Sequence, residues 1–166
     1  MELSLRGPVM IPSTDRPSHM RHQLLNDSHA QRMFAVVLET GDEAMSCLQE
    51  FVRANKISAA QLTGIGAFAD VTLGYFDWNK KQYVGNPVQE QVEVASMIGD
   101  VALSPSGEPA LHIHVVVGKR DGTALAGHLQ EARVRPTLEV IFNESPAHLQ
   151  KVHDPQSGLA LIRPKQ

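Results

Sequence analysis

The stretch LHIHVVVG (residues 111–118) is followed by the turn KRDGT (residues 119–123) and then by ALAGHLQEARV (residues 124–134). Two β-type runs on either side of a glycine-containing turn predict a β-hairpin. Residues two apart in a strand point to the same face, so we expect His112 and His114 to lie side by side, about 7 Å apart. This hairpin, with its paired imidazoles, is the element from which the rest of the fold is interpreted.

The length of the hairpin loop decides whether a third histidine joins the pair. If residues 120–122 form a three-residue loop, a type I turn followed by glycine in the left-handed region, His114 lies directly opposite His128. Cross-strand partners face the same side, with Cβ atoms about 5 Å apart. If the loop is only Asp121-Gly122, His128 pairs instead with Val115 and points to the opposite face. We favour the three-residue loop because it gathers three histidines in one place.

Three imidazoles with an open fourth position are typical of catalytic or exchangeable zinc sites, whereas structural zinc sites are usually closed by four ligands rich in cysteine. His112, His114 and His128 are therefore predicted to hold a divalent metal, zinc being the expected ion. Gly127, beside His128, leaves room for a ligand or for another backbone. The alternative is that the three histidines are polar sheet residues, hydrogen-bonded to water or carboxylates.

Two carboxylates are candidates to complete or orient such a site. Glu93 and Glu131 could act as a fourth ligand, as acceptors for an imidazole N–H, or as a general base. Each is alternatively an ordinary exposed strand residue. The sequence contains no nucleophile elbow, phosphate-binding loop or dinucleotide fingerprint. Cys47 lies on the apolar stripe of a predicted helix and is expected in the core.

The chain has 166 residues, of which 42% are hydrophobic and 20% charged. This length and composition favour one globular domain with tails. Short strands and one amphipathic helix predict an α+β fold, a compact single domain in which an antiparallel-rich sheet is flanked by that helix. The expected organisation is an extended N-terminal arm (1–30), the domain itself (31–147), and a C-terminal tail that packs on the domain or extends from it (148–166). Within the domain, residues 33–39 are the first expected strand, and separate strands are expected over residues 59–68, 71–78, 92–99, 100–104, 124–134 and 137–144. Residues 154–158 are expected to form a loop. The helix that follows has apolar residues at Ala44, Cys47 or Leu48, Phe51 and Val52, and ends near Asn55.

The net charge of −3 is unfavourable for nucleic-acid binding, which depends on basic residues that neutralise phosphates. Residues 31–166 hold 12 basic and 15 acidic residues, so the acidity belongs to the expected domain. The pairs Lys80-Lys81 and Lys119-Arg120 lie at predicted turns and are expected to be solvated.

The sequence has no apolar run near the ~20 residues of a membrane span, no signal-peptide pattern and a single cysteine, so we expect a cytoplasmic protein without a membrane partner.

The order of several blocks resembles the PPC (plants and prokaryotes conserved) domain over roughly residues 32–145. These blocks are GD before a helix, TGIGAFADVTLGYFD, VEVASMIGDVAL, LHIHVVVG, DGTALAGHLQEARV and TLEVIF. The resemblance implies a compact α+β fold, assembly as a homotrimer, and a metal site at His112, His114 and His128. It also implies the DNA-binding label carried by relatives with AT-hooks.

An AT-hook has a Gly-Arg-Pro core flanked by basic residues that enter the minor groove. This chain offers only Arg6-Gly7-Pro8 and Arg16-Pro17, which departs from that pattern. Two functions therefore stay open. The first is a DNA-associated regulatory trimer whose metal is structural or a sensor input, and the second is a metal-dependent enzyme or small-molecule binder with an open zinc position.

Overall fold

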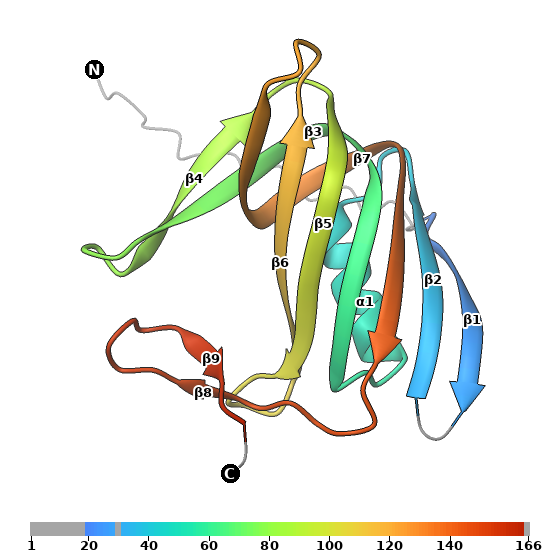
Figure 1. Cartoon of the computed structure of the whole chain (residues 1–166), viewed down its shortest axis with the longest axis vertical. Coiled ribbons are helices and arrows are strands. Elements are labelled where there is room, and N and C mark those ends of the chain that lie inside the picture. The colour runs from blue at the N-terminus through green and yellow to red at the C-terminus, as the bar shows by residue number, and fades with distance from the viewer. Residues whose placement is uncertain (1–18, 29–30, 165–166) are drawn as a thin grey trace, which may run out of the picture.

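The computed structural model describes residues 19–28 and 31–164, which form one large antiparallel sheet, a helix and a small hairpin (Figure 1). The elements are β1 (Arg21–Ser28), β2 (Gln31–Glu39), α1 (Ala44–Ala54), β3 (Ala59–Asp77), β4 (Gln82–Val88), β5 (Val92–Leu103), β6 (Pro109–Gly118), β7 (Ala124–Glu144), β8 (Lys151–His153) and β9 (Ala160–Ile162). The chain is therefore mostly β, and the expected α+β class holds only in outline.

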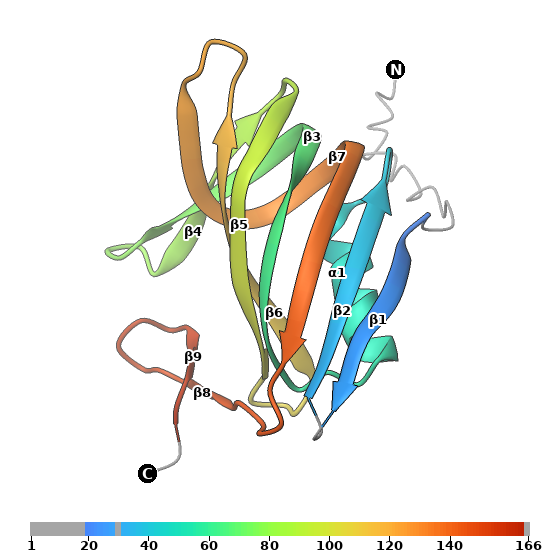
Figure 2. The ribbon, with the colours of Figure 1, turned by 45° about the vertical axis from the view of Figure 1, so that its right-hand side comes forward.

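Two long strands, β3 and β7, each pair with several other strands along their length. The first half of β3 pairs with β5 and its second half with β4, while β7 runs beside both halves. β7 also pairs with β6 through its first half and with β2 through its second. The pairings β3–β5–β6–β7 thus return to β3, and the sheet curves round on itself (Figures 1 and 2).

Gly66 is required where β3 bends against β7. Its φ is +154°, and a Cβ at this position would lie 2.3 Å from the carbonyl oxygen of Thr137. Any side chain would collide with the β7 backbone, so only glycine allows the two strands to approach this closely. The sequence predicted separate strands over residues 59–68 and 71–78, whereas the structure has one continuous bent strand.

The core lies between the inner face of the sheet and α1. The helix buries the expected residues Ala44, Cys47, Leu48, Phe51 and Val52, and its N-cap Glu43 accepts hydrogen bonds from the N–H groups of Met45 and Ser46. Phe51 packs against Phe34 and Phe142, with ring centroids 5.3 and 5.2 Å apart. The predictions of an amphipathic helix ending near Asn55 and of a buried Cys47 are confirmed.

The two ends of the chain add to this body in different ways. Residues 21–28, at the end of the expected arm, form β1 and pair with β2. The rest of the arm, including Arg6–Pro8 and Arg16–Pro17, lies outside the described residues apart from residues 19 and 20. Residues 151–162 form the β8–β9 hairpin, whose loop begins at Asp154 as predicted. No helix in the described part of the chain is long and apolar enough to cross a membrane.

Candidate metal centre

The three predicted histidines meet on the outward face of the sheet. His112, His114 and His128 each offer a ring nitrogen, and these nitrogens all lie within 4.8 Å of one another. The ring centroids are 5.1 to 5.5 Å apart. His112 and His128 are partly buried, while His114 is exposed.

The hairpin register that brings them together is the predicted one. His114 pairs directly with His128. The Lys119 N–H donates to the Thr123 carbonyl at 2.9 Å, and Gly122 has a φ of +84°, so residues 120–122 form the three-residue loop with a left-handed glycine. The two-residue alternative is therefore wrong.

The space beside Gly127 is used by another backbone. A Cβ on Gly127 would lie 3.0 Å from the carbonyl oxygen of Gly74 in β3. Gly74 in turn pairs with His128, so the strand that carries this histidine is held between β6 and β3. Close packing on both sides fixes the position from which the His128 ring projects.

A carboxylate that the sequence interpretation missed orients one of the histidines. Asp100 in β5 pairs with His112, and its Oδ2 lies 3.2 Å from His112 Nδ1. The other oxygen, Oδ1, lies 3.2 Å from the Lys151 ammonium in β8. A carboxylate on one ring nitrogen fixes the tautomer of a metal-binding histidine, which leaves His112 Nε2 available for a metal.

Neither predicted carboxylate belongs to this cluster. Glu93 pairs with Gly118 at the opposite end of the β5–β6 ladder from the Asp100–His112 pair. Glu131 is exposed and accepts a hydrogen bond from Thr72 Oγ1 at 3.0 Å. The length of a hairpin loop sets which residues of its two strands pair and share a face, and this reasoning located His128. Applied to β5 and β6, the same reasoning could have identified Asp100 from the sequence.

The His128 ring is enclosed on one side by an aromatic residue. Tyr83 in β4 stacks on it, with ring centroids 4.7 Å apart and an interplanar angle of 28°. His128 Nδ1 is buried and has no hydrogen-bond partner among the described residues. A buried polar atom without a partner is unusual in a folded protein, and a bound metal would satisfy it. This atom is the structural sign that the residues fit a metal.

The electrostatics of the cluster lower the pKa values of two of its imidazoles, His114 and His128, which favours their neutral form. Burial, followed by the charges of His112, His114 and Lys151, lowers the pKa of His128 from 6.5 to about 4. Burial and then His112 also lower the pKa of His114. Burial alone would raise the pKa of Asp100, but the hydrogen bond from His112 and the nearby Lys151 outweigh it and lower that pKa. Neutral imidazoles are the form that binds metals.

Zinc bound tetrahedrally, with Zn–N distances of about 2.0–2.1 Å, would place its nitrogen ligands roughly 3.3 Å apart. The ring nitrogens of the three histidines lie within 4.8 Å of one another, so they would have to move closer together to bind zinc in this way. Three protein ligands leave a fourth position for water or another molecule, as in catalytic zinc sites.

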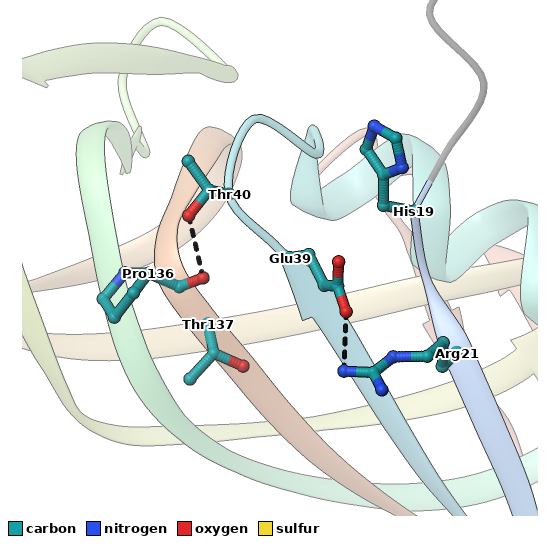
Figure 3. A pocket seen from close by; sticks show the side chains of 6 residues that line it. All are labelled: His19, Arg21, Glu39, Thr40, Pro136 and Thr137. Atoms are coloured by element: carbon teal, nitrogen blue, oxygen red, sulfur yellow. Dashed lines mark hydrogen bonds and ion pairs between the residues drawn. The ribbon is translucent and has the colours of Figure 1, made fainter.

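A polar hollow lies away from the histidine cluster, where β2 meets the bend of β7 (Figure 3). It has a volume of about 460 Å³ and is lined by His19, Arg21, Glu39, Thr40, Pro136 and Thr137. The Arg21 guanidinium and the Glu39 carboxylate face each other across 2.6 Å. Its lining includes one histidine and a carboxylate already paired with arginine, so it lacks the convergent ligands of the histidine cluster.

Comparison with solved structures places this fold among similar proteins. A protein described as a candidate DNA-binding protein from Bacteroides thetaiotaomicron has a TM-score of 0.77 and 25% identity, covering 86% of this chain and 96% of its own. A metal-containing protein from Archaeoglobus fulgidus has a TM-score of 0.73 and 34% identity, covering 80% and 93%. A plant- and prokaryote-conserved protein from Pyrococcus horikoshii has a TM-score of 0.75 and 28% identity, covering 88% and 96%.

No curated protein matches this chain. The family model for the Plants and Prokaryotes Conserved (PCC) domain matches residues 26–146, which include the whole histidine cluster and Asp100. The resemblance seen in the sequence blocks is thereby confirmed: the chain belongs to the PCC, or PPC, domain family.

Proposed function

We propose that this protein binds one divalent metal ion, zinc, per chain through His112, His114 and His128, and presents the open position of that ion to a small molecule. The observation that carries the proposal is the convergence of three ring nitrogens within 4.8 Å. The buried, unpaired His128 Nδ1 supports it. The Archaeoglobus fulgidus relative, described as a metal-containing protein, agrees with it.

Each residue has a defined part in this function. The three imidazoles hold the ion, and Asp100 holds the His112 ring in the orientation that presents Nε2. A bound zinc would supply Lewis-acid chemistry, polarising a carbonyl or lowering the pKa of a bound water. Tyr83 covers one side of His128 and keeps water from that side of the ring.

Metal analysis of purified protein reconstituted with zinc tests the proposal. Wild type is expected to retain about one zinc per chain after desalting, and the double variant His112→Ala, His114→Ala to retain none. His153→Ala is the matched control, because this exposed histidine in β8 lies outside the cluster and should leave the zinc content unchanged. Equal zinc in the wild type and the double variant would refute the site.

Self-association is a second part of the proposal, with a homotrimer expected from the family resemblance. Ile65, Ile98 and Ile141 are 61%, 56% and 36% exposed on the outward face of the sheet. Ile98 is the cross-strand partner of His114, so this apolar surface adjoins the metal site. Apolar side chains gathered on one face favour contact with another chain. Sedimentation equilibrium should give three times the monomer mass, and a monomer at micromolar concentration would contradict it.

Association with DNA is the other candidate function, and the description of the Bacteroides thetaiotaomicron relative favours it. The net charge of −3 opposes it, because phosphate binding depends on an excess of basic residues. We therefore place DNA association second to the metal site. Binding to duplex DNA that weakens steeply with salt would support it, and no binding at low salt would exclude it.

A further inference from the structure

Lys151 is a buried cation that the C-terminal segment brings to the metal centre. Its side chain is 9% exposed, and its ammonium lies 3.2 Å from Asp100 Oδ1. The segment before it is attached to the end of β5, where the Leu103 N–H donates to the Leu149 carbonyl and Gln150 Nε2 donates to the Ser104 carbonyl. Apart from Lys151, the one residue of the described tail that is buried is Ser157. A cation is thus placed in a segment that adds nothing to the apolar core.

The Lys151 ammonium is a multiple hydrogen-bond donor placed beside the carboxylate that orients His112. A lysine ammonium carries three N–H donors. Within the described residues its ion-pair partner is Asp100, whose other oxygen is engaged by His112. Buried charges are stabilised by pairing and hydrogen bonds, and donors left without acceptors are costly. The Lys151 ammonium is therefore a cationic donor that can serve a further acceptor near the site, besides its pairing with Asp100.

The charges of the residues around the histidine cluster also favour an anionic ligand on a bound divalent ion. Asp100 and Lys151 carry opposite charges and offset one another. The three histidines are neutral ligands, and Glu93 and Glu131 lie outside the cluster. A divalent ion held there would keep nearly its full charge of +2, in surroundings where water screens it only in part. An anionic ligand at the open position would reduce that charge.

Two neighbouring hairpins contribute one residue each to the surroundings of the histidine cluster, Tyr83 against His128 and Lys151 against Asp100. The β3–β4 arm, which carries Tyr83, and the β8–β9 hairpin, which carries Lys151, project on the same side of the molecule (Figures 1 and 2). Tyr83 covers His128 with its ring. Of these two residues, Lys151 is the one that carries a charge and can pair with an anion.

We propose that the metal centre takes a small carboxylate, with one oxygen at the open metal position and the other accepting from the Lys151 ammonium. Two oxygens on one carbon allow a carboxylate to meet both cations through separate atoms, and its negative charge offsets theirs. This inference rests on the proposed metal site and names the class of molecule that the site binds. Lys151 is the residue that confers selectivity for an anion.

Cobalt(II) in place of zinc gives a readout for both steps, because its visible absorption reports the ligands around the ion. The full chain is loaded with Co²⁺ and titrated with acetate and, separately, with imidazole as a neutral ligand. The variants are Lys151→Met, which removes the charge, and Lys151→Arg, which keeps it. Lys119→Met is the matched control, since Lys119 pairs with Glu90 near the β6–β7 loop, away from the cluster.

The expected result is saturable acetate binding to Co²⁺-loaded wild type, weakened about tenfold to a hundredfold in Lys151→Met, the range for loss of a charge-assisted hydrogen bond. Imidazole affinity should stay the same in both proteins. Lys151→Arg should bind acetate nearly as well as wild type, and Lys119→Met should match wild type.

The outcomes separate the two proposals. Absence of cobalt bands in wild type would overturn the metal site and, with it, this inference. Normal bands with no acetate binding, or with equal acetate affinity in wild type and Lys151→Met, would overturn the carboxylate inference alone. Equal weakening of acetate and imidazole in Lys151→Met would also overturn it, because Lys151 would then act through the structure of the site and not through its charge.

Discussion

The two faces of β6 differ in what holds them and in what they do. Ile113, Val115 and Val117 point inward and are at most 2% exposed. His112 and His114 alternate with them on the outward face, where they meet His128 and Asp100. Adjacent residues of one strand thus serve the core on one side and a polar centre on the other.

The inward and outward faces of β6 therefore depend on different features of the sequence. The inner face needs apolar residues at alternate positions, and several apolar side chains would satisfy it. The outer face needs a particular register between three strands, because its groups come from β5, β6 and β7. Substitutions on the inner face should therefore change folding stability, and those on the outer face should change ligand binding.

The largest effect is expected on the inner face. Ile113→Ala removes a fully buried side chain and should lower the free energy of unfolding by about 2–5 kcal/mol, through lost burial and the cavity left behind. Urea denaturation of the metal-free protein measures it. Val116→Ala, three residues further along β6 on the outward face and 38% exposed, is the control and should change stability by less than about 0.5 kcal/mol. Similar losses in both variants would break the distinction between the faces.

This contrast also explains how much of the molecule the sequence could predict. Alternation in residues 111–118 and helical spacing from Ala44 to Val52 depend on neighbours in the chain, and both were predicted. The His114–His128 pairing followed from the three-residue loop, which was favoured over the two-residue loop because it gathers three histidines. The continuous strands β3 and β7 were not predicted, because their bends depend on contacts between distant segments, such as Gly66 against Thr137.

The residues of the site also divide into those that local sequence patterns predict and those that depend on contacts between distant segments. Asp100 lies opposite His112 in the β5–β6 hairpin and was missed because residues 92–99 and 100–104 were interpreted as two strands, whereas β5 is continuous. Lys151 reaches the centre through a tail that no local pattern connects with β5. Its placement depends on hydrogen bonds made by Leu149 and Gln150, which alternation and turn chemistry do not specify.

An intermediate effect is expected for the carboxylate behind the histidines. Asp100→Asn removes the charge that orients His112 and should weaken zinc binding about tenfold to a hundredfold, as is usual for a carboxylate behind a metal ligand. Competition with a chromophoric chelator measures the affinity. Glu131→Gln is the matched control, because this exposed carboxylate contacts Thr72 and not the cluster. Weaker zinc binding in Glu131→Gln than in Asp100→Asn would reverse the assignment of the orienting residue.

The smallest effect is a pH dependence that belongs to the outer face alone. The pKa of His128 is lowered from 6.5 to about 4, first by burial and then by His112, His114 and Lys151. Between these two values the unfolded chain binds a proton at His128 that the folded, metal-free chain does not. The stability of the metal-free protein should therefore fall as the pH drops from about 6.5 to about 4, and this contribution should level off below that range.

His128→Gln isolates this contribution, because glutamine keeps a polar side chain but does not titrate. With metal removed by chelator, the melting temperature of wild type should decline more steeply than that of His128→Gln between pH 6.5 and 4. Above pH 6.5 the two curves should run parallel, since His128 is then neutral in both states. Because His128 is only partly buried, solvent screening keeps the difference below that expected for Ile113→Ala. If the melting temperatures of the two proteins ran parallel from pH 6.5 to 4, folding would not hold His128 neutral. The outer face would then add no pH dependence to the stability of the protein.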